Sequence, residues 1–151
     1  MLELIMRTLL IFAAADTACT ESGRDYKDGR VVLQVVINRS KTGWGRYDGT
    51  LWNALFSRSQ HAHWCKWPLT AEHLAMGMEF VQDSLRVPAW AKKALWYCNI
   101  EKPGTCEDRC PGGCELRGRF AHRFYGEPSK KQKAYARTTS SGGQRQSLQA
   151  Q

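Results

Sequence analysis

The sequence contains no long apolar run and no internal repeat. No stretch approaches the roughly 20 apolar residues that a membrane-crossing helix requires, and no segment recurs along the chain. A length of 151 residues with 42% hydrophobic and 24% charged residues is typical of one soluble globular domain. We therefore expect a single domain over residues 1–137. Residues 138–151 are rich in Ser, Gly and Gln, which predicts a flexible polar tail.

The first apolar segment matches a signal peptide only in part. Residues 9–15 resemble the apolar core of such a peptide, with Arg7 just before them, but Glu3 lies where basic residues are usual. Cleavage near Ala15 would remove most of the first apolar segment. We therefore expect an uncleaved first helix, and secretion through a cleaved or uncleaved N-terminal segment is the alternative.

Acidic residues are outnumbered. The chain has 22 Lys and Arg against 14 Asp and Glu, giving a net charge of +8. Such a surface favours polyanionic partners: nucleic acid, anionic lipid or an acidic cell-wall polymer. Charge alone does not choose among these three.

The CxxC pairs of common zinc sites are absent, although the chain has six cysteines. The cysteines are Cys19, Cys65 and the cluster of Cys98, Cys106, Cys110 and Cys114. An even number is consistent with disulfides in an oxidising compartment, with many pairings open. The spacing of the cluster favours disulfides or free thiols over zinc. His61 and His63 have no carboxylate at ligand spacing nearby, so we expect neither metal nor cofactor.

Apolar periodicity predicts a mainly helical, α+β chain. Residues 2–18 show helical spacing, residues 50–56 suit a short helix, and Pro88 suits the first turn of a helix over residues 90–97. Residues 99–118 show little sign of regular structure, and residues 119–125 alternate like a short strand. Thr70 is a good N-cap for a helix that reaches about Leu85. Its expected core face comprises Leu74, Met78, Val81 and Leu85.

The apolar run over residues 31–37 permits two interpretations. Its β-branched residues suit a buried strand. Arg30, Gln34 and Asn38, however, are four residues apart and would share one stripe of a helix. We therefore predict a mostly buried helix, with Gln34 and Asn38 facing a cleft.

One acidic residue, Glu21, follows the first helix in a polar turn over residues 20–26. Burial at a helix end disfavours a charged carboxylate and raises its pKa. This is the condition that a general acid needs at neutral pH. A surface role would be the commoner explanation for an isolated glutamate. Asp25 and Asp28, close by, lie in turn contexts that acidic residues favour anyway.

Three segments together resemble the SleB-like cell-wall hydrolases, a family of spore-cortex lytic enzymes and phage lysins. The first segment is Glu21–Arg39, a glutamate turn followed by a glycine and an apolar helix that ends in Asn-Arg. The second is Leu55–Gln60. The third is Ala94–Asn99, paired with Gly118–Tyr125. The segments lie in family order, although His61 and Cys98 stand where other residues are usual in the family.

The resemblance implies a compact fold similar to goose-type lysozyme and soluble lytic transglycosylases. The sequence itself adds a small β or extended element and a Cys-rich loop, which is not a hallmark of the family. Glu21 would protonate the glycosidic oxygen between N-acetylmuramic acid and N-acetylglucosamine. Most glycosidases use two carboxylates, and no second one stands out, which favours a lytic transglycosylase over a muramidase. The implied substrate-binding residues are Asn38, Gln60, Tyr97, Asn99, His122 and Tyr125.

The expected partner is therefore the glycan strand of bacterial peptidoglycan, on an anionic cell envelope. We expect a monomeric phage lysin, made in the host cytoplasm and acting on the cell wall in the periplasm, or carried on the virion. The alternative from another class is a basic nucleic-acid-binding protein with a zinc- or disulfide-held Cys-rich loop. That alternative predicts salt-sensitive binding to DNA or RNA and bound zinc.

Overall fold

The protein is described by a computed structural model, which covers residues 1–42, 50–56, 65–99, 115–117 and 122–126. Its helices are α1 (Leu2–Ser22), α2 (Tyr26–Thr42), α3 (Leu51–Phe56), α4 (Ala71–Val81) and the short 3₁₀ helix η1 (Ala89–Lys93). The strands β1 (Trp96–Asn99), β2 (Glu115–Arg117) and β3 (His122–Tyr125) form an antiparallel sheet in the order β1-β3-β2. The mainly helical α+β class is confirmed.

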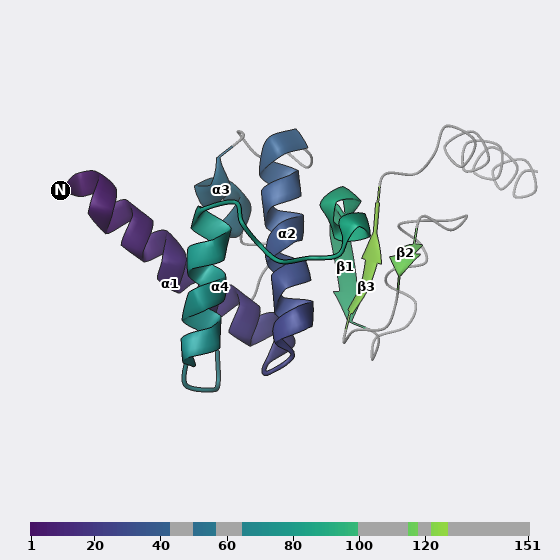
Figure 1. Cartoon of the computed structure of the whole chain (residues 1–151), viewed down its shortest axis with the longest axis horizontal. Coiled ribbons are helices and arrows are strands. Elements are labelled where there is room, and N and C mark those ends of the chain that lie inside the picture. Colours follow the sequence, from purple (N-terminus) through teal and green to yellow (C-terminus); the bar gives the residue numbers. More distant parts are fainter. Residues whose placement is uncertain (43–49, 57–64, 100–114, 118–121, 127–151) are drawn as a thin grey trace, which may run out of the picture.

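Helix α2 is the centre of the fold (Figure 1), and every residue from Val31 to Ser40 is buried. One side of α2, including Leu33 and Ile37, packs against α1, α3 and α4. The other side, including Val31 and Val35, packs against η1 and β3. Contacts on both sides explain why the helix is apolar nearly all round. The polar spacing, and not the β-branched content, predicted its structure correctly.

The sheet places two aromatic side chains and one histidine against α2. In the β1–β3 register Tyr97 is opposite Phe124 and Asn99 is opposite His122. Because alternate residues of a strand share a face, Tyr97, His122 and Phe124 project from the same side of the sheet. Phe124 and Tyr97 pack with the valines of α2, so His122 is also directed toward that helix.

The helix predicted over residues 90–97 is confirmed only in its first part, as the 3₁₀ helix η1. η1 ends at Lys93, Ala94 is extended, and β1 begins at Trp96. Trp96 and Tyr97 favour strands, and a strand this short is stabilised by pairing with β3, which lies far along the sequence. Strand β2 likewise lies inside residues 99–118, where we expected little regular structure.

Helix α4 begins as predicted and ends earlier. The Thr70 side chain accepts a hydrogen bond from the backbone N–H of His73, and the helix ends at Val81 instead of near Leu85. Met78, which we expected in the core, is exposed, and Met76 is buried in its place. At Gly77 α4 crosses α1 so closely that an added Cβ would overlap the carbonyl oxygen of Ile11. This crossing turns the side of α4 around Met76 and Gly77 toward the core.

Helix α1 has two unequal halves. Its N-terminal turns extend beyond the rest of the molecule (Figure 1) and expose large apolar side chains, among them Leu2, Leu4 and Phe12. Burial begins at Ala14. None of the helices in the described part of the chain is long and apolar enough to cross a membrane. The C-terminal half of α1 is the part that belongs to the core and carries Glu21.

Candidate active site

Glu21 lies in the last turn of α1 and not in the polar turn that we predicted. The helix continues to Ser22, and Gly23 ends it with a φ of 57°, a backbone conformation that favours glycine. The backbone N–H of Gly23 donates to the carbonyl oxygen of Cys19 over 2.9 Å. The Glu21 side chain is 17% exposed. Its carboxylate is therefore carried by a regular helix and retains access to solvent.

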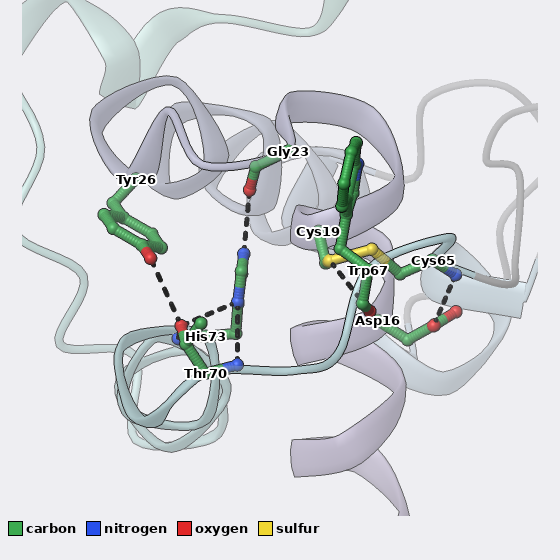
Figure 2. Close-up of a disulfide and its surroundings, with 8 residues drawn as sticks. All are labelled: Asp16, Cys19, Gly23, Tyr26, Cys65, Trp67, Thr70 and His73. Atoms are coloured by element: carbon green, nitrogen blue, oxygen red, sulfur yellow. Dashed lines mark hydrogen bonds between the residues drawn. A yellow bond between two sulfur atoms is a disulfide. The ribbon is translucent and has the colours of Figure 1, made fainter.

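Residues that precede and follow Glu21 in the sequence are both linked to the segment over residues 65–73 (Figure 2). On one side, Cys19 forms a disulfide with Cys65. On the other, the Nε2 atom of His73 lies 2.8 Å from the carbonyl oxygen of Gly23. The backbone N–H of Thr70 donates to His73 Nδ1, so Nε2 carries the ring hydrogen and donates to Gly23. These two links fix the end of α1 to the segment over residues 65–73.

The cysteine prediction is confirmed where it can be followed. Cys19, Cys65 and Cys98 are all disulfide-bonded. For Cys98, the described member of the cluster, this agrees with the prediction of disulfides or free thiols instead of zinc. The other three cysteines lie outside the described residues. In the described ranges no group of three His, Cys, Asp or Glu residues is arranged to hold a metal ion.

His122 lies between two carboxylates. Its Nδ1 atom is 2.7 Å from Asp28 Oδ2, and its Nε2 atom is 3.9 Å from Glu21 Oε2. The His122 side chain is almost fully buried and that of Asp28 is completely buried. The three residues come from the end of α1, the start of α2 and the start of β3. Their side chains form one chain of polar groups that leads from the interior to Glu21.

The surroundings of Asp28 define the protonation of the histidine. Its oxygens also accept hydrogen bonds from the Ser22 hydroxyl and from the backbone N–H of His122. Among the described residues no lysine or arginine forms an ion pair with Asp28. An ionised carboxylate only accepts, so His122 Nδ1 carries a hydrogen and donates to Asp28. Nε2 is then the nitrogen that faces Glu21.

Tyr97 contacts both His122 and Glu21. Its ring meets the His122 ring edge to face, with centroids 4.9 Å apart. Burial raises the pKa of the Tyr97 phenol well above its ordinary value. The negative charge of Glu21, to which the phenol is hydrogen-bonded, raises it further. The phenol therefore stays protonated and donates to the Glu21 carboxylate.

Of the predicted site residues, the structure brings Glu21, Tyr97 and His122 together. Asn38 lies at the other end of α2, where its amide donates to the carbonyl oxygens of Ala91 and Ala94. Tyr125 is buried and stacked against Trp96. The backbone of Asn99 pairs with His122. Gln60 lies outside the described residues.

Sequence reasoning missed Asp28 as a member of the site. The turn that we assigned to it is the first turn of α2. A signal was available, because Asp28, Val31, Val32 and Val35 follow the i, i+3, i+4, i+7 spacing of one helix face. A carboxylate on an otherwise apolar stripe requires a buried hydrogen-bonding partner, and that partner is His122.

No family model, curated protein or solved structure matches this chain. The geometry around Glu21, together with the order of the three sequence motifs, is therefore the basis for assigning a function.

Proposed function

We propose that the protein cleaves the glycan strand of peptidoglycan between N-acetylmuramic acid and N-acetylglucosamine, with Glu21 as the general acid. One observation carries this proposal. A partly exposed glutamate faces a buried histidine whose other nitrogen is bound to a buried aspartate, while a protonated phenol donates to the same glutamate. The proposal includes a lysozyme-like arrangement, in which a catalytic glutamate ends a core helix next to a small antiparallel sheet.

Each neighbour of Glu21 has a role in the proton transfer. Protonated Glu21 gives its proton to the glycosidic oxygen as the bond to the anomeric carbon breaks. The carboxylate that remains accepts a hydrogen bond from the Tyr97 phenol, and the Nε2 atom of His122 lies 3.9 Å from it. Asp28 orients the imidazole from behind. A correctly placed general acid contributes about 10²- to 10⁴-fold to the rate.

The state of Asp28 supports transglycosylation over hydrolysis. Among the described residues, Asp28 is the carboxylate that His122 connects to Glu21, but it is completely buried and both of its oxygens accept hydrogen bonds. It cannot reach a sugar ring as a nucleophile or activate a water, which is how a second carboxylate acts in most glycosidases. In a transglycosylase the C6 hydroxyl of the muramic sugar bonds to its own anomeric carbon. Glu21 accepts the C6 hydroxyl proton, and the product is a 1,6-anhydro sugar.

An exposed indole near the site suits a carbohydrate substrate. Trp67 is 59% exposed and lies beside the Cys19–Cys65 disulfide, only two residues from Cys65 (Figure 2). Indole faces stack on the apolar C–H faces of sugar rings. The net charge of +8 suits the anionic envelope in which the substrate lies.

The proposal is tested by incubating purified peptidoglycan with the wild-type protein and with Glu21→Gln. We expect Glu21→Gln to lower the release of soluble glycan fragments by about 10²- to 10⁴-fold. Circular dichroism and the melting temperature should be those of the wild type. Glu3→Gln, an equal change at an exposed position of α1, is the matched control and should release fragments normally.

Mass spectrometry of the released fragments identifies the chemistry. A 1,6-anhydro end is lighter by one water than the reducing end that hydrolysis leaves. Reducing ends alone would replace the transglycosylase with a muramidase that uses the same glutamate. Release at the wild-type rate by Glu21→Gln would overturn the proposal itself.

A further inference from the structure

A cavity of about 490 Å³ lies at the C-terminal end of α2, away from Glu21. It is bounded by α2, by η1 and by the adjoining ends of β1 and β3. Among the described residues that line it, three lysines are the only charged ones. These described lining residues are Asn38, Lys41, Thr42, Lys92, Lys93, Leu95 and Gly126.

The lysines leave positive charge at this cavity. Lys41 pairs with Asp83, and both side chains are more than half exposed. Lys92 and Lys93 are exposed, and neither forms an ion pair with any other described residue. Lysines near helix C-termini offset the partial negative charge of the helix end, which accounts for one lysine per helix. This effect of the helix ends does not account for three ammonium groups, contributed by two helices, around one cavity.

The remaining lining residues offer few free polar groups. Both donors of the Asn38 amide are directed to the carbonyl oxygens of Ala91 and Ala94, and its oxygen accepts from Gln34. Leu95 contributes an apolar side chain. The cavity therefore suits a ligand that combines carboxylates with small apolar groups.

The cavity and the Glu21 site lie along the same contact between α2 and the sheet. Asp28 and Asn38 are ten residues apart on α2, which corresponds to about 15 Å. On the sheet, His122 and Gly126 are four residues apart, or about 13 Å. The valines of α2 and Phe124 fill the interval between the two ends. A substrate that reaches the cavity from Glu21 must therefore extend well beyond the bond that is cleaved.

We infer that this cavity binds the peptide stem of peptidoglycan, with free carboxylates of the stem against Lys92 and Lys93. The inference rests on the proposed function. The stem branches from the muramic sugar and joins alanine methyl groups to acidic residues. Its carboxylates match the lysines, and its methyl groups match Leu95. The stem thereby adds recognition of the substrate without contact with the reacting atoms.

The test measures binding in the Glu21→Gln background, so that the outcome does not depend on cleavage. Co-sedimentation compares intact peptidoglycan with glycan strands from which an amidase has removed the stems. The test variant carries Lys92→Glu and Lys93→Glu. The control carries Lys66→Glu and Arg86→Glu, which change the net charge equally at exposed positions away from the cavity.

We expect the test variant to bind intact peptidoglycan about tenfold more weakly than the control, because two attractions become repulsions. The two variants should bind stem-free strands equally. Equal binding of intact peptidoglycan by both variants would overturn the inference, as would an equal loss on both substrates. If Glu21→Gln does not lower cleavage, the proposed function is overturned. The difference in binding between the test and control variants can still be interpreted in that case.

A second arm separates stem carboxylates from other anions. Inorganic phosphate at matched ionic strength should leave binding of intact peptidoglycan unchanged, and a soluble stem peptide should compete. Competition by phosphate and not by the peptide would assign the cavity to phosphate groups and overturn the inference.

Discussion

The two ends of α2 place similar polar residues in different surroundings. Asp28 near one end and Asn38 near the other are both buried, and both reach across to the layer formed by η1 and the sheet. Asp28 binds His122, a side chain whose second ring nitrogen faces Glu21. Asn38 binds the carbonyl oxygens of Ala91 and Ala94, which are backbone groups of the fold.

The difference distinguishes a buried group that supports chemistry from one that supports the fold. A buried amide that saturates backbone carbonyls fixes a distance between two elements. A buried carboxylate bound to a histidine also fixes the ring orientation and the tautomer of that histidine. Helical spacing had placed Asn38 at a cleft and the resemblance had placed it with the substrate, while both had left Asp28 out.

The largest effect is expected for Asp28→Asn, which keeps the shape of the side chain and removes its charge. The amide can donate to His122 Nδ1 as well as accept from it, so the ring hydrogen is no longer held on Nδ1. The nitrogen that faces Glu21 can then carry the hydrogen instead. We expect cleavage of peptidoglycan to fall by about 10²- to 10⁴-fold. The melting temperature should change little. Nitrogen NMR of His122 reports the tautomer, and activity within threefold of the wild type would contradict the prediction.

The opposite change, Asn38→Asp, should act on stability. A carboxylate would face the carbonyl oxygens of Ala91 and Ala94 without a hydrogen to donate, leaving two buried acceptors unpaired. We expect the free energy of unfolding to fall by about 3 kcal/mol, measured by urea denaturation. Below the melting temperature the kcat for peptidoglycan should stay near that of the wild type. A large loss of kcat in the folded variant would instead place Asn38 in the chemistry.

The smallest effect is expected from Tyr97 at alkaline pH. Its pKa in the folded protein is raised, so the native state holds the phenolic proton more tightly than the unfolded chain does. The free energy of unfolding should therefore decline as pH rises above about 10, the ordinary tyrosine value. Tyr97→Phe should flatten this decline. Thermal melts between pH 8 and 11 (about the range in which tyrosine titrates) would show a parallel decline in both proteins if Tyr97 made no contribution.

Local patterns predicted the helices well and long-range pairings poorly. The spacing of Arg30, Gln34 and Asn38 identified α2, and Thr70 identified the start of α4. The strand β1 was taken for a helix because its partner, β3, is more than 20 residues further on and its own sequence is short.

Prediction of the site residues shows the same difference between local patterns and long-range pairings. Motif order pointed to Glu21, Tyr97 and His122. Asp28 was missed because its role depends on a histidine 94 residues away. The partner of Cys19 could not be chosen either, since six cysteines permit many pairings.

The Cys19–Cys65 disulfide also changes the connectivity of the chain. With the backbone it closes a covalent ring over a sequence separation of 46 residues. Glu21 and Asp28 lie inside this ring, and Tyr97 and His122 lie outside it. A protease that cuts once between Cys19 and Cys65 opens the ring without dividing the molecule. In an oxidising compartment, Glu21 and Asp28 therefore remain parts of one covalent molecule even after the backbone between them is broken.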